Sequence, residues 1–260
     1  MAENVNIPVL RLGDLSKSFG GLKAISSLSL EVAPGSISAI IGPNGAGKTT
    51  VFNLISGLEK TDGGSIHFRD TRIDVMRSWE IPPLGIARTF QNLRLFSNMT
   101  VLENVMMGRY VRSRASLLGC ALNLRGPRRE ERDIREKALQ WLDFMGITGL
   151  SDKKIREIPF EKQRLVEITR ALAGEPALLL LDEPAAGLNI TETRNLIDTI
   201  YRIRNLGITI LVIEHDMDLI MEISERISVL NFGRKIAEGG PAEVRSNRDV
   251  IAVYLGKEFA

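Results

Sequence analysis

Short apolar runs alternate with longer amphipathic stretches along most of this chain. The pattern predicts strands at residues 8–17 and 23–33, the second alternating in AISSLSLEV, and a buried strand at 36–42, SISAIIG. Further apolar runs follow in ALLLLDEP, GITILVIEH and RISVLNFG, with helix-like stretches between them. Apolar strands that alternate with helices of this length predict a covered parallel sheet.

Helical periodicity interrupts this pattern in the middle of the chain. It begins after PPLG at 82–85 and continues through LENVMMGRY and IREKALQWLDFMGI to about residue 172. We therefore expect one α/β domain over residues 1–260, in which a helical subdomain at 91–165 is inserted into a core made of 1–90 and 166–260.

A glycine-rich loop joins the strand at 36–42 to a helix, and its sequence GPNGAGKT fits the pattern G-x-x-x-x-G-K-[ST]. Glycines let the backbone N–H groups face phosphate oxygens, and the helix N-terminus adds a favourable dipole. Lys48 supplies a cation for the β- and γ-phosphates, and the Thr49 hydroxyl can bind Mg²⁺. A glycine turn that merely joins strand to helix would not account for the spacing, the Lys-Thr pair and the context together. The predicted ATP-binding residues are Gly42, Pro43, Asn44, Gly45, Ala46, Gly47, Lys48, Thr49 and Thr50.

Two acids and a histidine end the later apolar runs. Asp182 closes ALLLLD, at the carboxyl end of a buried strand, so its carboxylate can reach a bound Mg²⁺. Glu183 follows and could polarise the attacking water, although an acid pair by itself could simply cap the next helix. His215 closes ITILVIEH. A single histidine at a strand end is more often structural, but its place at the phosphate edge of the sheet favours contact with the γ-phosphate.

The balance and distribution of charge limit the classes of partner that this chain could bind. Thirty-four Lys and Arg against 32 Asp and Glu give a net charge of +2, which is too balanced to indicate a nucleic-acid partner. Residues 109–135 are rich in arginine, which we interpret as a solvated, partly salt-bridged helix face, with docking near an anionic membrane as the alternative.

The compartment is predicted from three absences. Cys120 is the only cysteine, so neither a disulfide framework nor a Cys-based zinc site is expected. The N-terminal residues lack the pattern of a secretory signal, and no apolar run approaches the roughly 20 residues that span a bilayer. We expect a cytoplasmic protein, which could still be bound to a membrane complex.

Together these motifs resemble the ATP-binding-cassette ATPases over nearly the whole chain. The resemblance implies a P-loop NTPase core with a parallel sheet, an N-terminal antiparallel β subdomain and an inserted helical subdomain. It implies that Phe19 in KSFGG stacks on adenine and that Gln91 in RTFQN links the metal and the attacking water to a transmembrane coupling interface. AAGLN at 185–189 is similar to the D-loop, with Asn189 where Asp is usual.

Longer stretches narrow the resemblance to the ATP-binding subunits of branched-chain amino-acid importers. These stretches are RTFQNLRLFSNMTVLENVMMG at 88–108, DEPAAGLN at 182–189 and AEGGPAEVRSNRDVIAVYLG at 237–256. The likeness implies a Mg²⁺-dependent ATPase on the inner face of the cell membrane. Its implied partners are transmembrane permeases, a second ABC ATPase in a heterodimer rather than a homodimer, and indirectly a periplasmic solute-binding protein. The alternatives are a soluble ABC-type ATPase and a weakly hydrolysing nucleotide-dependent regulator.

One segment departs from the family's pattern. The signature element, usually L-S-G-G-Q, precedes QRLVEITRAL and donates from its helix N-terminus to the γ-phosphate held by the opposite subunit. Here its five positions are occupied by Ile158, Pro159, Phe160, Glu161 and Lys162. Pro159 suits the first turn of a helix. A carboxylate at Glu161, about 5 Å from a phosphate charge, costs on the order of 3 kcal/mol at an effective dielectric of about 20, unless Lys162 or Mg²⁺ offsets it or the acid turns outward. We therefore predict a competent nucleotide site on this chain and a signature that serves its partner's nucleotide poorly.

Overall fold

The computed structural model describes residues 7–113 and 125–255. Both ends of the chain lie outside these residues, as do Cys120 and a portion of the arginine-rich segment 109–135. The chain divides into two compact units, one formed by residues up to Ile81 and from Ala177 onward, the other by Pro82–Pro176. The predicted boundaries at 91 and 165 both lie inside the second unit, and a boundary at 165 would cut the continuous helix α5 (Phe160–Ala173).

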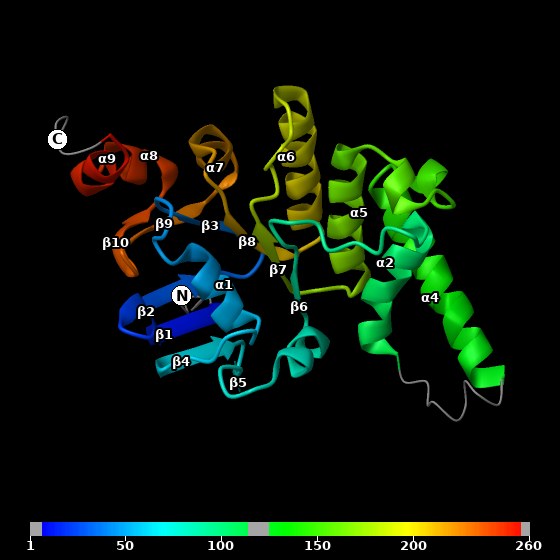
Figure 1. Ribbon diagram of the computed structural model, residues 1–260, viewed down its shortest axis with the longest axis horizontal. Helices are drawn as coiled ribbons and strands as arrows, with labels where there is room; N and C mark the ends of the chain where they lie inside the picture. The colour runs from blue at the N-terminus through cyan, green and yellow to red at the C-terminus, as the bar shows by residue number, and fades with distance from the viewer. Residues whose placement is uncertain (1–6, 114–124, 256–260) are drawn as a thin grey trace, which may run out of the picture. The chain divides into compact units, whose positions relative to one another are not determined.

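A mostly parallel sheet forms the core of the first unit, as the apolar runs predict. Its strands follow the order β10-β9-β3-β8-β7 (Figure 1). Every residue of β3, β7 and β8 is buried, which explains why these strands read as continuous apolar runs. The strands are β3 (Ile37–Ile41), β7 (Leu178–Asp182), β8 (Thr209–Ile213), β9 (Arg226–Asn231) and β10 (Arg234–Gly239).

The register of the parallel strands brings three loops to one edge. β8 pairs in parallel with both β3 and β7, and Ile213 is opposite Ile40 on one side and Asp182 on the other. The glycine-rich loop after β3, the acid pair at the end of β7 and the residues after β8 therefore leave the sheet at the same end.

An antiparallel sheet completes the β structure of the first unit, and the expected β subdomain is confirmed. It is the blue-to-cyan sheet of Figure 1, in the order β2-β1-β4-β5. Asp74, just after this sheet, is 8% exposed and accepts from the Ile66 N–H at 2.9 Å and from the Arg72 guanidinium at 3.0–3.2 Å. The strands are β1 (Leu10–Phe19), β2 (Leu22–Val32), β4 (Gly63–Phe68) and β5 (Thr71–Arg72).

Several helices of the first unit begin at a residue that caps the helix N-terminus or directly after glycine. Asn189 caps α6 through a bond from the Glu192 N–H at 3.0 Å, and Asp216 caps α7 through the Leu219 N–H at 3.1 Å. Helix α1 follows the glycine-rich loop directly. The elements are α1 (Lys48–Ile55), η1 (Ser78–Glu80), α6 (Ile190–Asn205), α7 (Met217–Ile223), α8 (Pro241–Ser246) and α9 (Arg248–Leu255).

The second unit is mostly helical. Its longer helices α2, α4 and α5 pack against one another (Figure 1). Gly108 of α2 lies against α5 so closely that a Cβ there would sit 1.8 Å from the Arg170 carbonyl oxygen. The elements are η2 (Pro82–Leu84), β6 (Ile86–Arg88), α2 (Val101–Arg109), η3 (Tyr110–Arg112), α4 (Arg125–Phe144), η4 (Thr148–Leu150), η5 (Ile155–Glu157) and α5.

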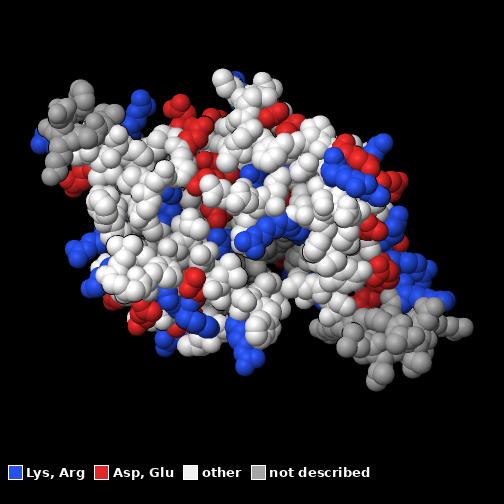
Figure 2. All heavy atoms as spheres, in the orientation of Figure 1, with Lys and Arg blue, Asp and Glu red and all other residues white. Residues whose placement is uncertain are grey.

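The charge on the surface is mixed, as the balanced composition predicts. Lys and Arg side chains lie interspersed with Asp and Glu on the face shown in Figure 2. Within residues 7–113 and 125–255, none of the helices combines the length and the apolar character that a membrane span requires.

Candidate functional site

The glycine-rich loop after β3 has a backbone that only glycine can adopt at two of its positions. Gly42 has φ 151°, and a Cβ there would lie 2.1 Å from the Leu230 carbonyl oxygen. Gly47 has φ 103°, and a Cβ there would lie 2.6 Å from the Ala24 carbonyl oxygen. These close approaches place the loop against β9 and β2, where its curvature requires glycine.

Lys48 places a cation inside this loop. The residue is 5% exposed, and its Nζ donates to the carbonyl oxygens of Gly42 at 2.7 Å and Pro43 at 3.0 Å. Burial lowers the pKa of Lys48, while the nearby carboxylates of Glu183 and Asp182 oppose that shift. A buried ammonium at the first position of α1, beside curled backbone amides, fits the phosphates of a nucleotide.

The rest of the predicted loop surrounds this cation. Asn44, Gly45 and Thr49 are exposed, whereas Ala46 is buried. Thr49 and Thr50 belong to the first turn of α1. The Thr49 hydroxyl and the Asp182 carboxylate are both hard oxygen ligands of the type that Mg²⁺ prefers.

The acid pair leaves β7 through a strained turn. Asp182 is the last residue of the strand and is 2% exposed. Glu183 has φ 47°, a left-handed conformation that costs a residue with a side chain on the order of 1–2 kcal/mol. Its N–H donates to the Ile213 carbonyl oxygen at 2.9 Å, and its carbonyl oxygen accepts from the Ala186 N–H at 3.2 Å. The strained turn is therefore supported from both sides.

His215 comes from the next strand and meets this acid. Its Nε2 lies 2.8 Å from Oε1 of Glu183. The Glu183 side chain is 12% exposed and that of His215 is 42% exposed. The structure thus brings together the residue predicted to polarise water and the residue predicted to contact the γ-phosphate.

Glu214 is a residue of this edge that the sequence analysis did not single out. It is 4% exposed, and its carboxylate accepts from the N–H of Ala185 at 2.7 Å and of His215 at 2.9 Å. Burial raises the pKa of Glu214, and the backbone N–H groups of Ala185, His215 and Asp216 oppose the shift. The signal was the acid in ITILVIEH, directly after a wholly apolar strand.

Tyr254 of α9 is a second unpredicted neighbour of the loop. Burial raises the pKa of Tyr254, and a hydrogen bond from the backbone of Gly42 to the phenol opposes that rise. The sequence pattern gives no sign of this contact, because more than 200 residues separate the two positions along the chain.

Phe19, the predicted adenine-stacking residue, lies at the end of β1. Its side chain is 46% exposed, and Lys17 Nζ lies 5.2 Å from the centre of the ring. The ring is therefore open to stacking, with a cation already on it.

Gln91 and the signature belong to the second unit. Arg164, 1% exposed, donates to the carbonyl oxygens of Phe90 at 3.0 Å and Gln91 at 3.1 Å, and so holds the backbone that carries Gln91. Arg164 also pairs with buried Glu167 at 3.2 Å. Burial raises the pKa of Glu167, while backbone donors and neighbouring guanidinium groups oppose the shift.

The signature segment begins a helix in the structure. Pro159 is the residue before the first turn of α5, where no amide donor is needed, and Phe160 opens the helix with a ring that is 46% exposed. Glu161 is paired with its neighbour, because Lys162 Nζ lies 3.1 Å from Glu161 Oε1. The compensation considered for Lys162 is thus present within the chain.

The structure shows what Asn189 does in the D-loop, where Asp is usual. Its side chain caps α6, and its own N–H donates to the Glu192 carboxylate at 2.9 Å. Asparagine caps a helix as well as aspartate does, so the substitution leaves the start of α6 intact.

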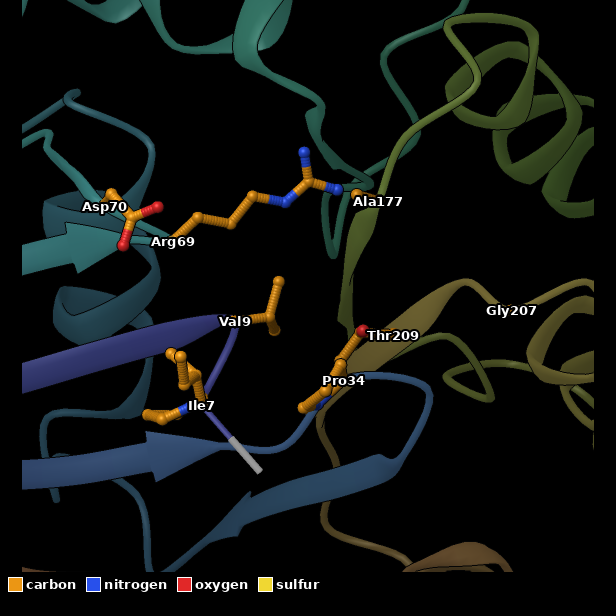
Figure 3. A pocket seen from close by; sticks show the side chains of 9 residues that line it. Ile7, Val9, Pro34, Arg69, Asp70, Ala177, Gly207 and Thr209 are labelled. Carbon is orange, nitrogen blue, oxygen red and sulfur yellow. The ribbon is translucent and has the colours of Figure 1, made fainter. Parts of the chain in front are cut away.

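A cavity of about 320 Å³ lies at the other end of the same sheet. Its lining includes Pro34, Ala177 and Thr209, which precede or open parallel strands, and residues next to the antiparallel sheet, with the Arg69 side chain extended across it (Figure 3). Ligands of open α/β sheets bind at the carboxyl ends of the strands, so this hollow is separate from the phosphate loop.

Comparison with known proteins decides the family. Residues 25–186 match the family described as "ABC transporter". The chain belongs to the ABC transporter family. Residues 234–260 also match the family described as "Branched-chain amino acid ATP-binding cassette transporter". The expected ABC ATPase fold and the expected ATPase activity are therefore confirmed, and the chain is an ATP-binding subunit of a transporter.

The relatives cover nearly the whole chain. The high-affinity branched-chain amino acid transport ATP-binding protein LivG of Escherichia coli is 41% identical over 96% of this chain and 98% of its own length. The high-affinity branched-chain amino acid transport ATP-binding protein BraF of Pseudomonas aeruginosa is 39% identical over the same shares. A solved ATP-binding cassette of an ABC transporter in its ADP conformation superposes with a TM-score of 0.84, at 34% identity, over 96% of this chain and 99% of that one.

Proposed function

We propose that this chain is the ATPase subunit of an importer for branched-chain or other hydrophobic amino acids. The observation that carries the proposal is the likeness to LivG over 96% of the chain, which continues through the C-terminal segment 234–260. The solute itself would be chosen by the permeases and the solute-binding protein, so the amino acid is inferred from kinship.

The residues of the sheet edge take separate roles in this proposal. The amides of the glycine-rich loop and Lys48 hold the β- and γ-phosphates, and the Phe19 ring stacks on adenine. Glu183 polarises the attacking water and His215 contacts the γ-phosphate, which is consistent with the 2.8 Å between their side chains.

Mg²⁺ fits the oxygen ligands at this edge. We propose that Thr49 and Asp182 hold it, and that the ion neutralises charge on the phosphates during transfer. Gln91 joins the proposed metal ligands on the likeness of RTFQN alone.

The partners follow from the same proposal. The second unit, as the helical subdomain, would meet transmembrane permeases on the inner face of the cell membrane. A second ABC ATPase would close on this chain around nucleotide, and hydrolysis would release it. Because the signature carries Glu161, a heterodimer would keep one good site, and a periplasmic solute-binding protein would deliver the solute.

Uptake measurements test the importer function. A strain that lacks this chain should lose ATP-driven uptake of radiolabelled leucine, and the wild-type gene should restore it while Lys48→Ala should not. The same chain should copurify with membrane proteins. Unchanged uptake, or recovery of the chain only as a soluble ATPase, would favour the soluble alternative. ATP binding without turnover in the assembled complex would favour the regulator.

A further inference from the structure

We propose that Glu214 is a positioning residue for ATP hydrolysis, which sets the distance between Glu183 and His215. Its two carboxylate oxygens accept from two different loops: Oε1 from the Ala185 N–H at 2.7 Å and Oε2 from the His215 N–H at 2.9 Å. Ala185 follows β7 and His215 follows β8, so one buried side chain joins the loops that carry the two groups. The inference rests on the proposed roles of Glu183 and His215.

The contacts form a closed ring. The Glu183 and His215 side chains meet at 2.8 Å. The backbone runs from Glu183 to Ala185 on one side and from Glu214 to His215 on the other. The Glu214 carboxylate closes the ring by accepting from the Ala185 N–H. The register of β7 with β8 ends at Asp182 and Ile213, and one further backbone bond runs from the Glu183 N–H to the Ile213 carbonyl oxygen. Beyond these backbone bonds, the Glu214 carboxylate joins the Ala185 N–H to the His215 N–H.

The strained backbone explains why such a brace is needed. Glu183 has φ 47°, and a conformation of this kind persists only where the surroundings over-determine it. The turn after it has its own bonds, since Ala186 N–H donates to the Glu183 carbonyl oxygen and Leu188 N–H to that of Ala185. The bond from Ala185 to Glu214 adds a second support from the neighbouring strand, beside the bond from the Glu183 N–H to the Ile213 carbonyl oxygen.

Burial shows that this acid belongs to the interior of the site. Glu214 is 4% exposed. Its satisfied partners are backbone N–H groups, those of Ala185, His215 and Asp216. A carboxylate used in this way is rigid, because all of its donors belong to the two loops.

Glu214→Gln tests the proposal in the full-length chain and in its assembled transporter. The amide keeps the size of the side chain but sets an NH₂ group against one of the two backbone N–H donors. We expect turnover at saturating ATP to fall about tenfold or more, while the ATP concentration at half-maximal rate changes by less than about threefold. Glu225→Gln is the matched control, because Glu225 also accepts from a backbone N–H, that of Ile37, but at the opposite end of the sheet. It should keep turnover within about twofold.

A double-mutant cycle separates positioning from general stability. If Glu214 acts through His215, then Glu214→Gln combined with His215→Ala should lose less turnover than the product of the two single losses. Independent, fully multiplicative losses would overturn the proposal. So would unchanged turnover in Glu214→Gln.

Hydrogen exchange of the wild-type chain decides the matter if Glu214→Gln does not fold. The Ala185 amide proton should exchange much more slowly than that of exposed Asn44, because the buried carboxylate holds it. Equal exchange rates would contradict the proposal. Retained turnover in Glu183→Gln would instead remove the proposed water-polarising role, and leave the Glu214 contacts as a structural brace.

Discussion

Nε2 of His215 lies 2.8 Å from Oε1 of Glu183, across the edge of the sheet where the phosphate loop ends. The imidazole donates this bond in the tautomer whose Nε2 carries the proton. The two side chains come from neighbouring parallel strands that are paired up to Asp182 and Ile213. The group proposed to polarise water and the group proposed to contact the γ-phosphate thus lie within hydrogen-bond distance of each other.

Glu183→Gln should suppress hydrolysis and spare ATP binding. The proposed phosphate cradle of glycine amides and Lys48 is untouched by the change, whereas the group proposed to polarise water is lost. We expect turnover to fall by about 10² or more, with nucleotide affinity changed by less than about threefold, as measured by steady-state turnover and by fluorescent-nucleotide titration. Glu192→Gln, which alters only the cap of α6, is a control that should retain turnover. Retained turnover in Glu183→Gln would remove this residue from the catalytic role.

His215→Ala should reduce turnover more than it weakens ATP binding in the isolated chain. Removal of the imidazole deprives Glu183 of its partner at 2.8 Å and leaves the phosphate loop as it is. We expect turnover to fall about tenfold or more, in the range seen when a group that stabilises the transition state is lost. Unchanged turnover in His215→Ala would contradict the proposed contact with the γ-phosphate.

The Glu161–Lys162 pair makes two substitutions act in opposite directions. Their side chains are joined at 3.1 Å, so in the proposed dimer Lys162 would offset part of the repulsion between Glu161 and a partner's triphosphate. Glu161→Gly, and Glu161→Gln as the variant that keeps the helix former, should strengthen ATP-dependent dimerisation by up to about tenfold. Lys162→Gln should weaken it.

Analytical ultracentrifugation in the presence of ATP measures this dimerisation directly, in variants that also carry a substitution that blocks hydrolysis. The trend should shrink as salt is raised, since exposed charges are screened. If Glu161→Gly and the wild type dimerise and hydrolyse equally well, the acid faces solvent in the dimer and the charge argument fails.

Asp74 should make the stability of the first unit depend on acid. Burial raises its pKa, but the Arg72 guanidinium and the Ile66 N–H outweigh that effect and hold the pKa of Asp74 below its ordinary value. Because the folded-state pKa is lowered, this stabilisation is present above the unfolded pKa, near 3.8, and is lost as pH falls through the folded pKa.

Asp74→Asn should therefore lower the free energy of unfolding by about 1–3 kcal/mol near neutral pH. The gap between variant and wild type should close at strongly acidic pH, as measured by urea unfolding followed by circular dichroism. A gap that is independent of pH would mean that the effect comes from packing rather than from the carboxylate charge.

The sequence by itself determined the core of this protein. Continuous apolar runs at β3, β7 and β8 predict strands buried on both faces, and the spacing of Gly42, Gly47, Lys48 and Thr49 predicts a phosphate loop before any contact is known. Both signals are local, because burial fixes the hydrophobic pattern and the loop needs glycine at set intervals.

The tertiary structure decided which distant residues share the site. Glu214 appears as one acid after a strand, yet it joins Ala185 to His215, and Tyr254 gives no signal although its phenol meets the backbone of Gly42. The position of the subdomain boundary also depends on the tertiary structure, since α5 is continuous from Phe160 to Ala173 through the predicted division at 165. Hydrophobic periodicity reports which face of an element is buried, whereas the partner of a buried polar atom depends on how the elements pack.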